Sequence, residues 1–262
     1  MEYKTILTEV TEGVLVITLN RPEAKNAISA RMWAEMQDAL ELWDADDSQR
    51  VAIITNTGDV FCAGADLKEL AEGVWHGPED KPDWGCGGYT KHFFEKPIIC
   101  AVRGKALGGG LELVIAADLA VASSESIFGL PEPLVGLTAA GGGGLIRIAQ
   151  QIPLKYANEL LFTSNPVSAE KALEWGLLNY VVDDEEVMEK AMQIARDIVR
   201  GAPLSISCSK RTVYETMNES TVYPSPGWER LEEIEKITRG SRDALEGATA
   251  FAEKRKPHWE GR

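Results

Sequence analysis

The sequence predicts an α/β core over residues 1–190, followed by a helical region over residues 191–262. In the first part, short β-branched apolar runs alternate with segments of helical spacing, which favours parallel strands joined by crossover helices. In the second part helical spacing continues without strand-like runs. With 44% hydrophobic and 26% charged residues in a 262-residue chain, the composition is typical of a globular protein.

The first fifty-five residues predict a strand–helix–strand unit. Val14–Asn20 and Val51–Thr55 are rich in β-branched residues and read as buried strands, and Tyr3–Glu9 is the expected hairpin partner of the first. Ser29 is the expected N-cap of the helix between them. The apolar positions of that helix are Trp33, Met36, Leu40 and Trp43.

Irregular segments separate the next elements. Arg21–Ala27 and Asn56–Asp66 read as loops, and residues 73–88, rich in Gly, Pro, Asp and Trp, predict a long loop or a mobile segment. The expected elements of this part are short helices at Leu67–Ala71 and Thr90–Phe94, a strand at Pro97–Val102, a helix at Gly109–Ala117, and strands at Leu119–Ser123 and Ser126–Phe128.

From about Gly141 onward the chain reads as mostly helical. Ser168 is the expected cap of a helix at Ala169–Trp175, and Asn179–Val182 is expected to form a last strand. Further helices are expected at about 185–200, 204–217, 227–238 and 242–254.

The net charge of −14 argues against nucleic acid and against anionic membrane surfaces as partners, because both bind basic surfaces. No stretch has the roughly 18 uninterrupted apolar residues of a membrane-spanning helix. The N-terminus shows no basic segment followed by an apolar run, so we expect no signal peptide.

The four cysteines show no paired spacing, and the chain has only three histidines. We therefore expect free thiols in a reducing compartment, a cytoplasmic location, and no metal site. The histidines His76, His92 and His258 belong to no visible nucleophile triad, because no Gly-x-Ser-x-Gly elbow occurs.

Two glycine runs and two glutamates stand out as candidates for chemistry. The segments are Ala106–Glu112, Phe128–Glu132 and Ala140–Gly144. Each glycine run can bring bare backbone N–H groups close to a ligand, at what reads as the start of a helix. Backbone donors for a developing oxyanion, beside two carboxylates that move protons, suit proton transfer next to a carbonyl.

Each glutamate also has an ordinary interpretation. Glu112 lies among apolar residues, so it is either a functional acid or one half of a structural ion pair. Glu132 follows Pro131 in a loop, where a carboxylate is usually solvated. Likewise, the loop aromatics Trp75, Trp84 and Tyr89 line an acyl pocket in one interpretation and belong to a disordered flap in another.

The chain resembles the crotonase (enoyl-CoA hydratase/isomerase) superfamily over essentially its whole length. The segments that carry the resemblance are Asn20–Ala27, Phe61–Leu67, Gly104–Glu112, Phe128–Glu132, Ala172–Asn179 and Glu246–Arg255. The tail Phe251–Arg262 and the segment Gly87–Tyr89 are most similar to the carnitinyl-CoA dehydratase branch. Where some hydratases have a Pro and a Gly, this chain has Leu137–Ala140, which leaves the shape of the pocket open.

The resemblance implies a spiral of strand–strand–helix turns and a C-terminal helical trimerisation region, with a homotrimer or a dimer of trimers as the assembly. It implies an acyl-CoA thioester substrate and no cofactor, since coenzyme A is part of the substrate. The thioester oxygen would be held by the N–H groups of Ala65 and Gly109. Glu112 and Glu132 would be the catalytic carboxylates.

The resemblance also implies contacts to the substrate through backbone and side chains of several matching segments. These positions are Ala24, Asn26, Ala63, Asp66, Leu67, Lys68, Gly108, Pro131, Gly141, Phe251 and Lys254. Lys25, Lys68, Lys254 and Arg255 are candidates for the CoA phosphates, with Phe251 and Lys254 reaching the CoA of a neighbouring subunit.

The expected activity is hydration of an enoyl-CoA. Three alternatives stay open: a sister reaction on the same scaffold, such as isomerisation or dehydration of a carnitinyl-CoA, a non-catalytic acyl-CoA-binding protein, and a metal-dependent carboxylate enzyme. The intact pair of carboxylates argues against the second, and the lack of ligand clusters argues against the third.

Overall fold

The computed structural model describes residues 3–262. The chain divides into two compact units, one made of Met1–Phe94 and Ile98–Ala195 and the other of Glu95–Pro97 and Arg196–Arg262. The first unit holds both sheets, and the second is helical.

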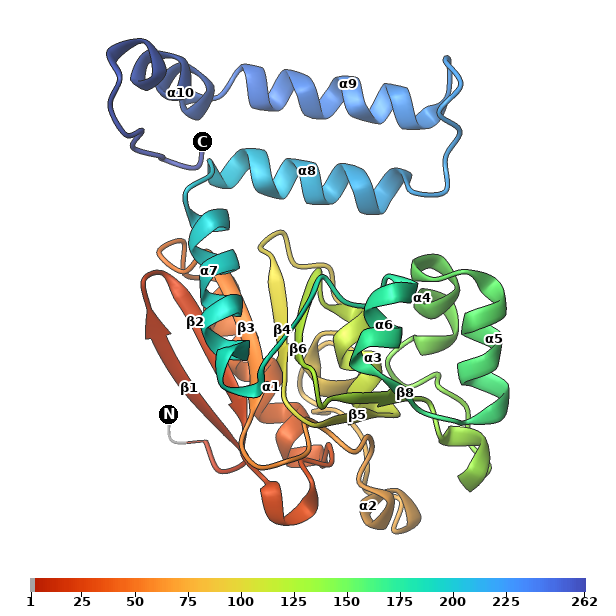
Figure 1. Cartoon of the computed structure of the whole chain (residues 1–262). Coiled ribbons are helices and arrows are strands. Elements are labelled where there is room, and N and C mark those ends of the chain that lie inside the picture. Colours follow the sequence, from red (N-terminus) through yellow and green to blue (C-terminus); the bar gives the residue numbers. More distant parts are fainter. Residues whose placement is uncertain (1–2) are drawn as a thin grey trace. The chain divides into compact units, whose positions relative to one another are not determined.

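A six-stranded sheet forms the main layer of the first unit (Figure 1). Its first two strands pair antiparallel and the others parallel, because helices or long connections return the chain between them. The strands lie in the order β1 (Ile6–Thr11), β2 (Val14–Leu19), β3 (Val51–Asn56), β4 (Ile98–Val102), β6 (Leu119–Ser123) and β9 (Tyr180–Val182). Every residue of β3 and β4 is buried, as expected for central parallel strands.

A second sheet has three short strands, β5 (Lys105–Leu107), β7 (Ile127–Gly129) and β8 (Val167–Ser168). Two strand–strand–helix turns follow each other along the chain: β4–β5–α3, where α3 is Gly109–Ala116, and β6–β7–α4, where α4 is Gly144–Gln151. The predicted α/β fold of the crotonase type, with its spiral of such turns, is therefore confirmed.

The predicted helix caps are confirmed. Ser29 Oγ accepts the Met32 N–H at 3.1 Å to open α1 (Ala30–Asp44), and Ser168 Oγ accepts the Lys171 N–H at 3.3 Å to open α6 (Ala169–Trp175). The other α-helices that begin in this unit are α2 (Leu67–Ala71), α5 (Leu154–Thr163) and α7 (Val187–Val199). Short 3₁₀ segments lie at η1 (Pro22–Ala24), η2 (Cys86–Gly88), η3 (Glu132–Val135) and η4 (Asp184–Glu186).

The predicted helix at Thr90–Phe94 is wrong, because this segment is a turn followed by irregular chain. Aromatic contacts hold it instead. The His92 ring stacks on Trp84 with 4.0 Å between ring centroids, and Phe94 meets the His92 ring edge-on at 4.5 Å. A residue pattern that suits a helix has been overridden by packing between side chains.

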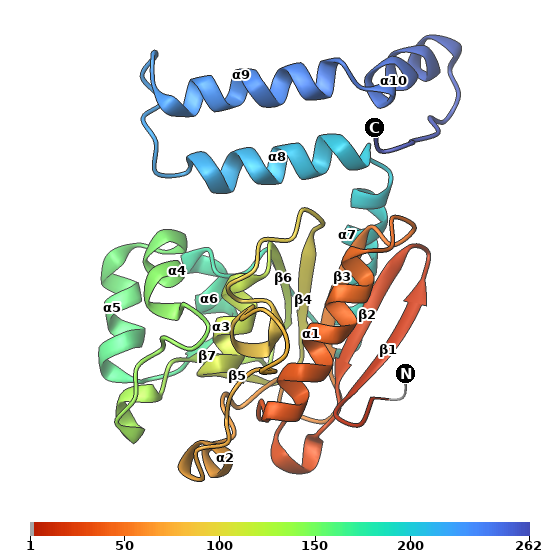
Figure 2. The same cartoon turned by 180° about the vertical axis from the view of Figure 1, so that it is seen from behind.

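The second unit contains the helices α8 (Pro203–Thr216), α9 (Pro226–Arg239) and α10 (Arg242–Glu253). Helices α8 and α9 lie side by side in both views (Figure 2). Lys210 Nζ donates to the Lys96 carbonyl at 3.0 Å, which ties α8 to the segment Glu95–Pro97. No helix among residues 3–262 is long and apolar enough to cross a membrane.

Candidate active site

The first glycine run opens helix α3 at a sharp turn after β5. Gly108 has φ +55°, a conformation that side chains disfavour, and its N–H donates to the Gly129 carbonyl at 2.9 Å. A Cβ on Gly110 would lie 2.2 Å from the Cys62 carbonyl oxygen, so only glycine fits there. As the first residue of α3, Gly109 presents an N–H that has no acceptor within residues 3–262.

A second unpaired N–H comes from Ala65. The Ile28 N–H donates to the Gly64 carbonyl at 2.8 Å, and the Asp66 N–H donates to the Ile28 carbonyl at 3.0 Å. This pairing leaves the intervening Ala65 N–H without an acceptor in the part of the chain that the structure describes.

The two unpaired N–H groups lie next to each other. A Cβ on Gly109 would lie 3.6 Å from the Ala65 nitrogen, and a Cβ on Gly64 would lie 3.1 Å from the Gly109 nitrogen. Two main-chain donors from separate segments therefore border one small space, at the positive end of α3. This arrangement can hold a carbonyl oxygen that gains negative charge.

Glu112 lies on the first turn of α3 and is almost fully buried, with 3% of its surface exposed. Its Oε1 accepts the Gly144 N–H at 2.8 Å. Burial raises the pKa of Glu112, while the amides of Gly144 and Gly142 and the charge of Arg147 oppose that rise by stabilising the carboxylate. The side chain is thus a desolvated acid whose anion has dedicated donors.

Glu132 begins the η3 segment after β7. Its Oε2 is buried and has no hydrogen-bond partner among the described residues. A Cβ on Gly108 would lie 3.2 Å from Glu132 Oε1, which places this carboxylate beside the turn that opens α3. Burial, with a further contribution from the charge of Glu112, raises the pKa of Glu132 to about 7.

The two glutamates therefore come together, although 19 residues lie between them in the sequence. Glu112 influences the pKa of Glu132 directly, and both influence the buried thiol of Cys86. Two nearby carboxylates in a poorly solvated site favour a single shared proton. The arrangement can deliver a proton from one side chain while the other accepts one.

The second glycine run wraps around Glu112, which the sequence did not indicate. A Cβ on Gly142 would lie 2.6 Å from Glu112 Cβ, and a Cβ on Gly144 would lie 3.0 Å from Glu112 Oε1. Arg147 Nη1 donates to the Gly142 carbonyl at 3.1 Å and so braces this loop. The signal available beforehand was the run of four glycines, Gly141–Gly144, at a helix start.

Several of the predicted substrate contacts surround this centre. The Asp66 side chain caps α2 by accepting the Lys68 N–H at 3.2 Å, and it pairs with Arg21 at 3.3 Å. Lys68 is exposed. The neighbouring predicted positions are Ala24 on η1, Ala63, Leu67 on α2, Pro131 beside Glu132, and Gly141 beside Glu112.

Asn26 is fully buried, and its side chain braces a loop. Its Oδ1 accepts the Arg21 N–H at 2.7 Å, and its Nδ2 donates to the carbonyls of Thr57 at 2.9 Å and Val60 at 2.8 Å. These bonds hold the loop that carries Ala24 and Lys25 against the segment after β3, so the side chain is occupied within the fold.

Phe251 and Lys254 belong to the second unit, at the end of α10. Phe251 has 86% of its surface exposed. Lys254 is exposed and caps α10 in the left-handed conformation, whereas Arg255 forms ion pairs with Glu246 and Glu253. Their contact with a substrate stays a prediction.

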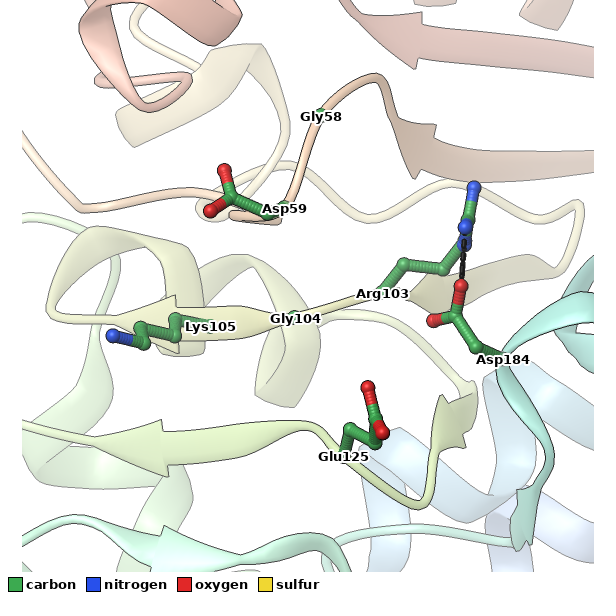
Figure 3. A pocket seen from close by; sticks show the side chains of 7 residues that line it. All are labelled: Gly58, Asp59, Arg103, Gly104, Lys105, Glu125 and Asp184. Carbon is green, nitrogen blue, oxygen red and sulfur yellow. Dashed lines mark hydrogen bonds and ion pairs between the residues drawn. The ribbon is translucent and has the colours of Figure 1, made fainter.

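A pocket of about 490 Å³ opens where β4 ends and β5 begins (Figure 3). None of the predicted site residues lines it. Arg103 and Asp184 form an ion pair at one side, and Lys105 extends away from them. The remaining lining residues are Gly58, Asp59, Gly104 and Glu125. Acidic and basic side chains lie together there, so the pocket offers no field of a single sign.

The four cysteines are free and buried. Among residues 3–262, no group of three or more His, Cys, Asp or Glu side chains is arranged to hold a metal ion.

Comparisons with known proteins identify the family of the chain. The sequence model of the enoyl-CoA hydratase/isomerase family matches residues 9–262. A carnitinyl-CoA dehydratase from Proteus mirabilis (strain HI4320) is 41% identical over 257 residues, which cover 95% of this chain and 96% of that protein.

Solved structures give the same assignment. A crystal structure of an enoyl-CoA hydratase from Mycobacterium tuberculosis H37Rv superposes with a TM-score of 0.90 at 40% identity, covering 98% of this chain and 99% of that one. A carnitinyl-CoA dehydratase from Mycobacterium avium 104 superposes with a TM-score of 0.78 at 45% identity, with the same coverage of each chain. The resemblance inferred from the sequence is thereby confirmed, and the chain belongs to the enoyl-CoA hydratase/isomerase family, the crotonases.

Proposed function

We propose that the protein catalyses the reversible addition of water to the α,β double bond of an acyl-CoA thioester. The observation that carries the proposal is the convergence of two carboxylates, the buried Glu112 and the partly buried Glu132, beside the unpaired N–H groups of Ala65 and Gly109. Polarising a carbonyl and moving two protons next to it requires these groups and no others.

In the forward direction, the N–H groups of Ala65 and Gly109 donate hydrogen bonds to the thioester oxygen. Water, held between the carboxylates, attacks the β-carbon with its oxygen. The electron pair of the double bond moves toward the thioester oxygen, where the two N–H groups stabilise the enolate charge. Losing one such donor typically raises the barrier by roughly 2.7–4 kcal/mol.

The surroundings of the glutamates assign their roles. Glu112 receives the N–H of Gly144, which favours its anion, so it accepts the proton of the attacking water. Glu132, with a pKa raised to about 7, keeps a proton near neutral pH and delivers it to the α-carbon. The pair holds one proton before and after the reaction, because Glu112 gains a proton from the water and Glu132 gives a proton to the α-carbon.

The remaining predicted contacts complete the proposal. Lys68, three residues after Ala65 on α2, would bind the CoA portion of the substrate. Phe251 and Lys254 of α10 would reach the CoA that is bound to a neighbouring subunit. The exposed Phe251 ring suits a role at the interface of a homotrimer or a dimer of trimers. The proposed reaction adds the elements of water without a net oxidation or reduction, so it calls for no redox cofactor, and the two carboxylates and two N–H groups take the roles that a metal would otherwise have.

A second candidate is dehydration of a hydroxyacyl-CoA such as a carnitinyl thioester. It is favoured by relatives at 41% identity that are named carnitinyl-CoA dehydratases. The same carboxylates serve both directions, because the forward and reverse reactions share one transition state. Isomerisation of the double bond is a further sister reaction, and it incorporates no water.

The test is incubation of the protein with crotonyl-CoA and with crotonobetainyl-CoA in water enriched in heavy oxygen, followed by mass spectrometry. We expect a 3-hydroxyacyl-CoA carrying the label, no effect of a chelator, and no product from the double variant Glu112→Gln/Glu132→Gln. The preferred substrate separates the two candidates. A shifted double bond without label would indicate an isomerase, and binding without turnover would indicate a non-catalytic protein.

A further inference from the structure

The indole of Trp75 and Oε2 of Glu112 both lie close to Gly141. A Cβ on Gly141 would lie 3.5 Å from Trp75 Cη2 and 3.7 Å from Glu112 Oε2. The rim of the indole and the carboxylate oxygen therefore border the same small volume beside Gly141. Trp75 is partly buried.

Contacts on two sides hold this ring in place. The indole Nε1 donates to the Ile28 carbonyl at 2.6 Å. The ring meets Trp33 of α1 edge-on, with 5.2 Å between ring centroids. The segment 73–88 is thus anchored to the fold at Trp75.

The anchor also connects the indole to the main chain that presents Ala65. The Ile28 carbonyl accepts both the Trp75 indole N–H and the Asp66 backbone N–H, at 2.6 and 3.0 Å. The Ile28 carbonyl therefore joins the Trp75 indole to the turn that carries the Ala65 N–H next to Gly109. Moving the indole disturbs a bond at that turn.

The direction of the acyl chain follows from the proposed function, on which this inference rests. The thioester oxygen lies at the N–H groups of Ala65 and Gly109, and Glu112 acts at the β-carbon. Carbons beyond the β-carbon then continue past Glu112 toward Trp75. On the other side the Cys86 N–H donates to the Gly141 carbonyl at 3.4 Å, and Cys86 is buried, so the chain has a wall there as well.

We propose that Trp75 sets the depth of the acyl pocket and makes the protein selective for short-chain acyl-CoA thioesters. A longer chain must displace the indole, which breaks its bond to the Ile28 carbonyl and its contact with Trp33. A single methylene in a hydrophobic pocket already changes kcat/KM by roughly 10–200-fold, so a fixed ring discriminates strongly between chain lengths.

The test compares crotonyl-CoA with trans-2-octenoyl-CoA for wild type, Trp75→Leu, Trp75→Phe and the control Val74→Ala, which changes the exposed neighbour in the same loop. The measured quantity is the ratio of the two kcat/KM values in one preparation, because the fraction of active protein cancels in it. Wild type should prefer crotonyl-CoA. Trp75→Leu should raise the octenoyl-to-crotonyl ratio by about ten-fold or more.

Trp75→Phe should shift the ratio less, since it keeps a ring in the loop, and it also serves as the second variant if Trp75→Leu folds poorly. Val74→Ala should leave the ratio unchanged. A wild-type preference for octenoyl-CoA, an unchanged ratio in both Trp75 variants, or an equal shift in Val74→Ala would overturn the proposal.

Affinities for unreactive butyryl-CoA and octanoyl-CoA, measured by calorimetry, separate this inference from the proposed function. If wild type hydrates neither enoyl-CoA but Trp75→Leu gains affinity for octanoyl-CoA, the pocket wall is supported and the proposed reaction fails. If hydration proceeds while Trp75→Leu leaves both the rate ratio and the relative affinities unchanged, the reaction stands and the role of Trp75 is rejected.

Discussion

The two regions that supply the carboxylates are built differently. Glu112 lies on a regular helix, 3% exposed, with Gly144 donating to its Oε1 and a glycine loop folded around it. Glu132 lies on a short 3₁₀ segment, and its buried Oε2 has no partner among residues 3–262. Apolar side chains beside it, Leu134 and Val135, are exposed.

The difference shows how one fold gives two identical side chains different surroundings, which suits the opposite roles proposed for them. Donors built into the glycine loop stabilise the anion of Glu112, whereas the unsatisfied oxygen of Glu132 favours its protonated form. A buried polar atom left without a partner costs free energy, so the site stores an unmet hydrogen bond that water or substrate can supply.

The largest effect is expected from replacing either carboxyl group. Glu112→Gln and Glu132→Gln should each lower kcat for hydration of crotonyl-CoA by roughly 10²–10⁴-fold, the usual contribution of a general acid or base. Stopped assays at several concentrations of crotonyl-CoA measure kcat for each variant. Glu125→Gln, which changes an exposed carboxylate in the separate pocket of Figure 3, should keep wild-type activity. If Glu112→Gln is as active as wild type, Glu112 is not the base that accepts the proton of the attacking water.

The next effect comes from filling the space that the glycines leave. In Gly142→Ala the new Cβ would lie 2.6 Å from Glu112 Cβ, and in Gly108→Ala it would lie 3.2 Å from Glu132 Oε1 at a residue with φ +55°. Each variant should lose about 1–3 kcal/mol of unfolding free energy through overpacking or backbone strain. Each should also lose kcat, because its glutamate is displaced.

Gly136→Ala is the matched control for these glycine variants. Gly136 also has a positive φ, +74°, but a Cβ there would meet nothing within 4 Å. Denaturant unfolding should show a strain penalty of about 1–2 kcal/mol in Gly136→Ala, with kcat retained. If its kcat falls as far as that of Gly108→Ala, strain and not the position of Glu132 explains the loss.

A smaller effect concerns stability and pH. The folded-state pKa of Glu132 is raised to about 7 from an ordinary value of 4.5, so its protonated form supports folding and this support is lost as pH rises through 7. Glu132→Gln should therefore exceed wild type in unfolding free energy by about 1–2 kcal/mol at alkaline pH, after allowing for solvent screening. Near pH 4 the two proteins should be equally stable. Urea titrations across this range measure the difference.

The same pKa predicts how the rate depends on pH. In the proposed mechanism hydration needs protonated Glu132, so kcat/KM of wild type should fall as pH rises through about 7. A rate that keeps rising above this pH would assign the proton donor to another group.

The smallest effect is expected at Arg147. This residue braces the Gly142 carbonyl at 3.1 Å, and its charge lowers the pKa of Glu112. Arg147→Gln removes the charge, so the acidic limb of the pH–rate profile should move to higher pH. Arg147→Lys keeps the charge and should move it less. A shift to lower pH would show that the charge does not act on Glu112 in this way.

Local features of the site could be predicted from the sequence because they depend on nearby residues. The caps Ser29 and Ser168 and the helix starts at both glycine runs follow from spacing within a few positions. The strands β5 and β8 could not be predicted, because β5 has three residues and β8 has two, which is too few for a periodic pattern. They pair only because the surrounding chain positions them. The turn at Thr90–Phe94 follows ring contacts that no local rule contains.

By itself, the sequence determined which residues could do the chemistry. These are two glutamates and two glycine runs, whose backbone N–H groups no side chain shields from a ligand. The tertiary structure decided that Glu112 and Glu132 meet, that Ala65 and Gly109 stand together, and that the second glycine run and Arg147 serve Glu112. The physical reason is range. Helix and turn preferences act over a few residues, whereas a pKa and a donor pair depend on whatever the folded chain brings within several ångströms.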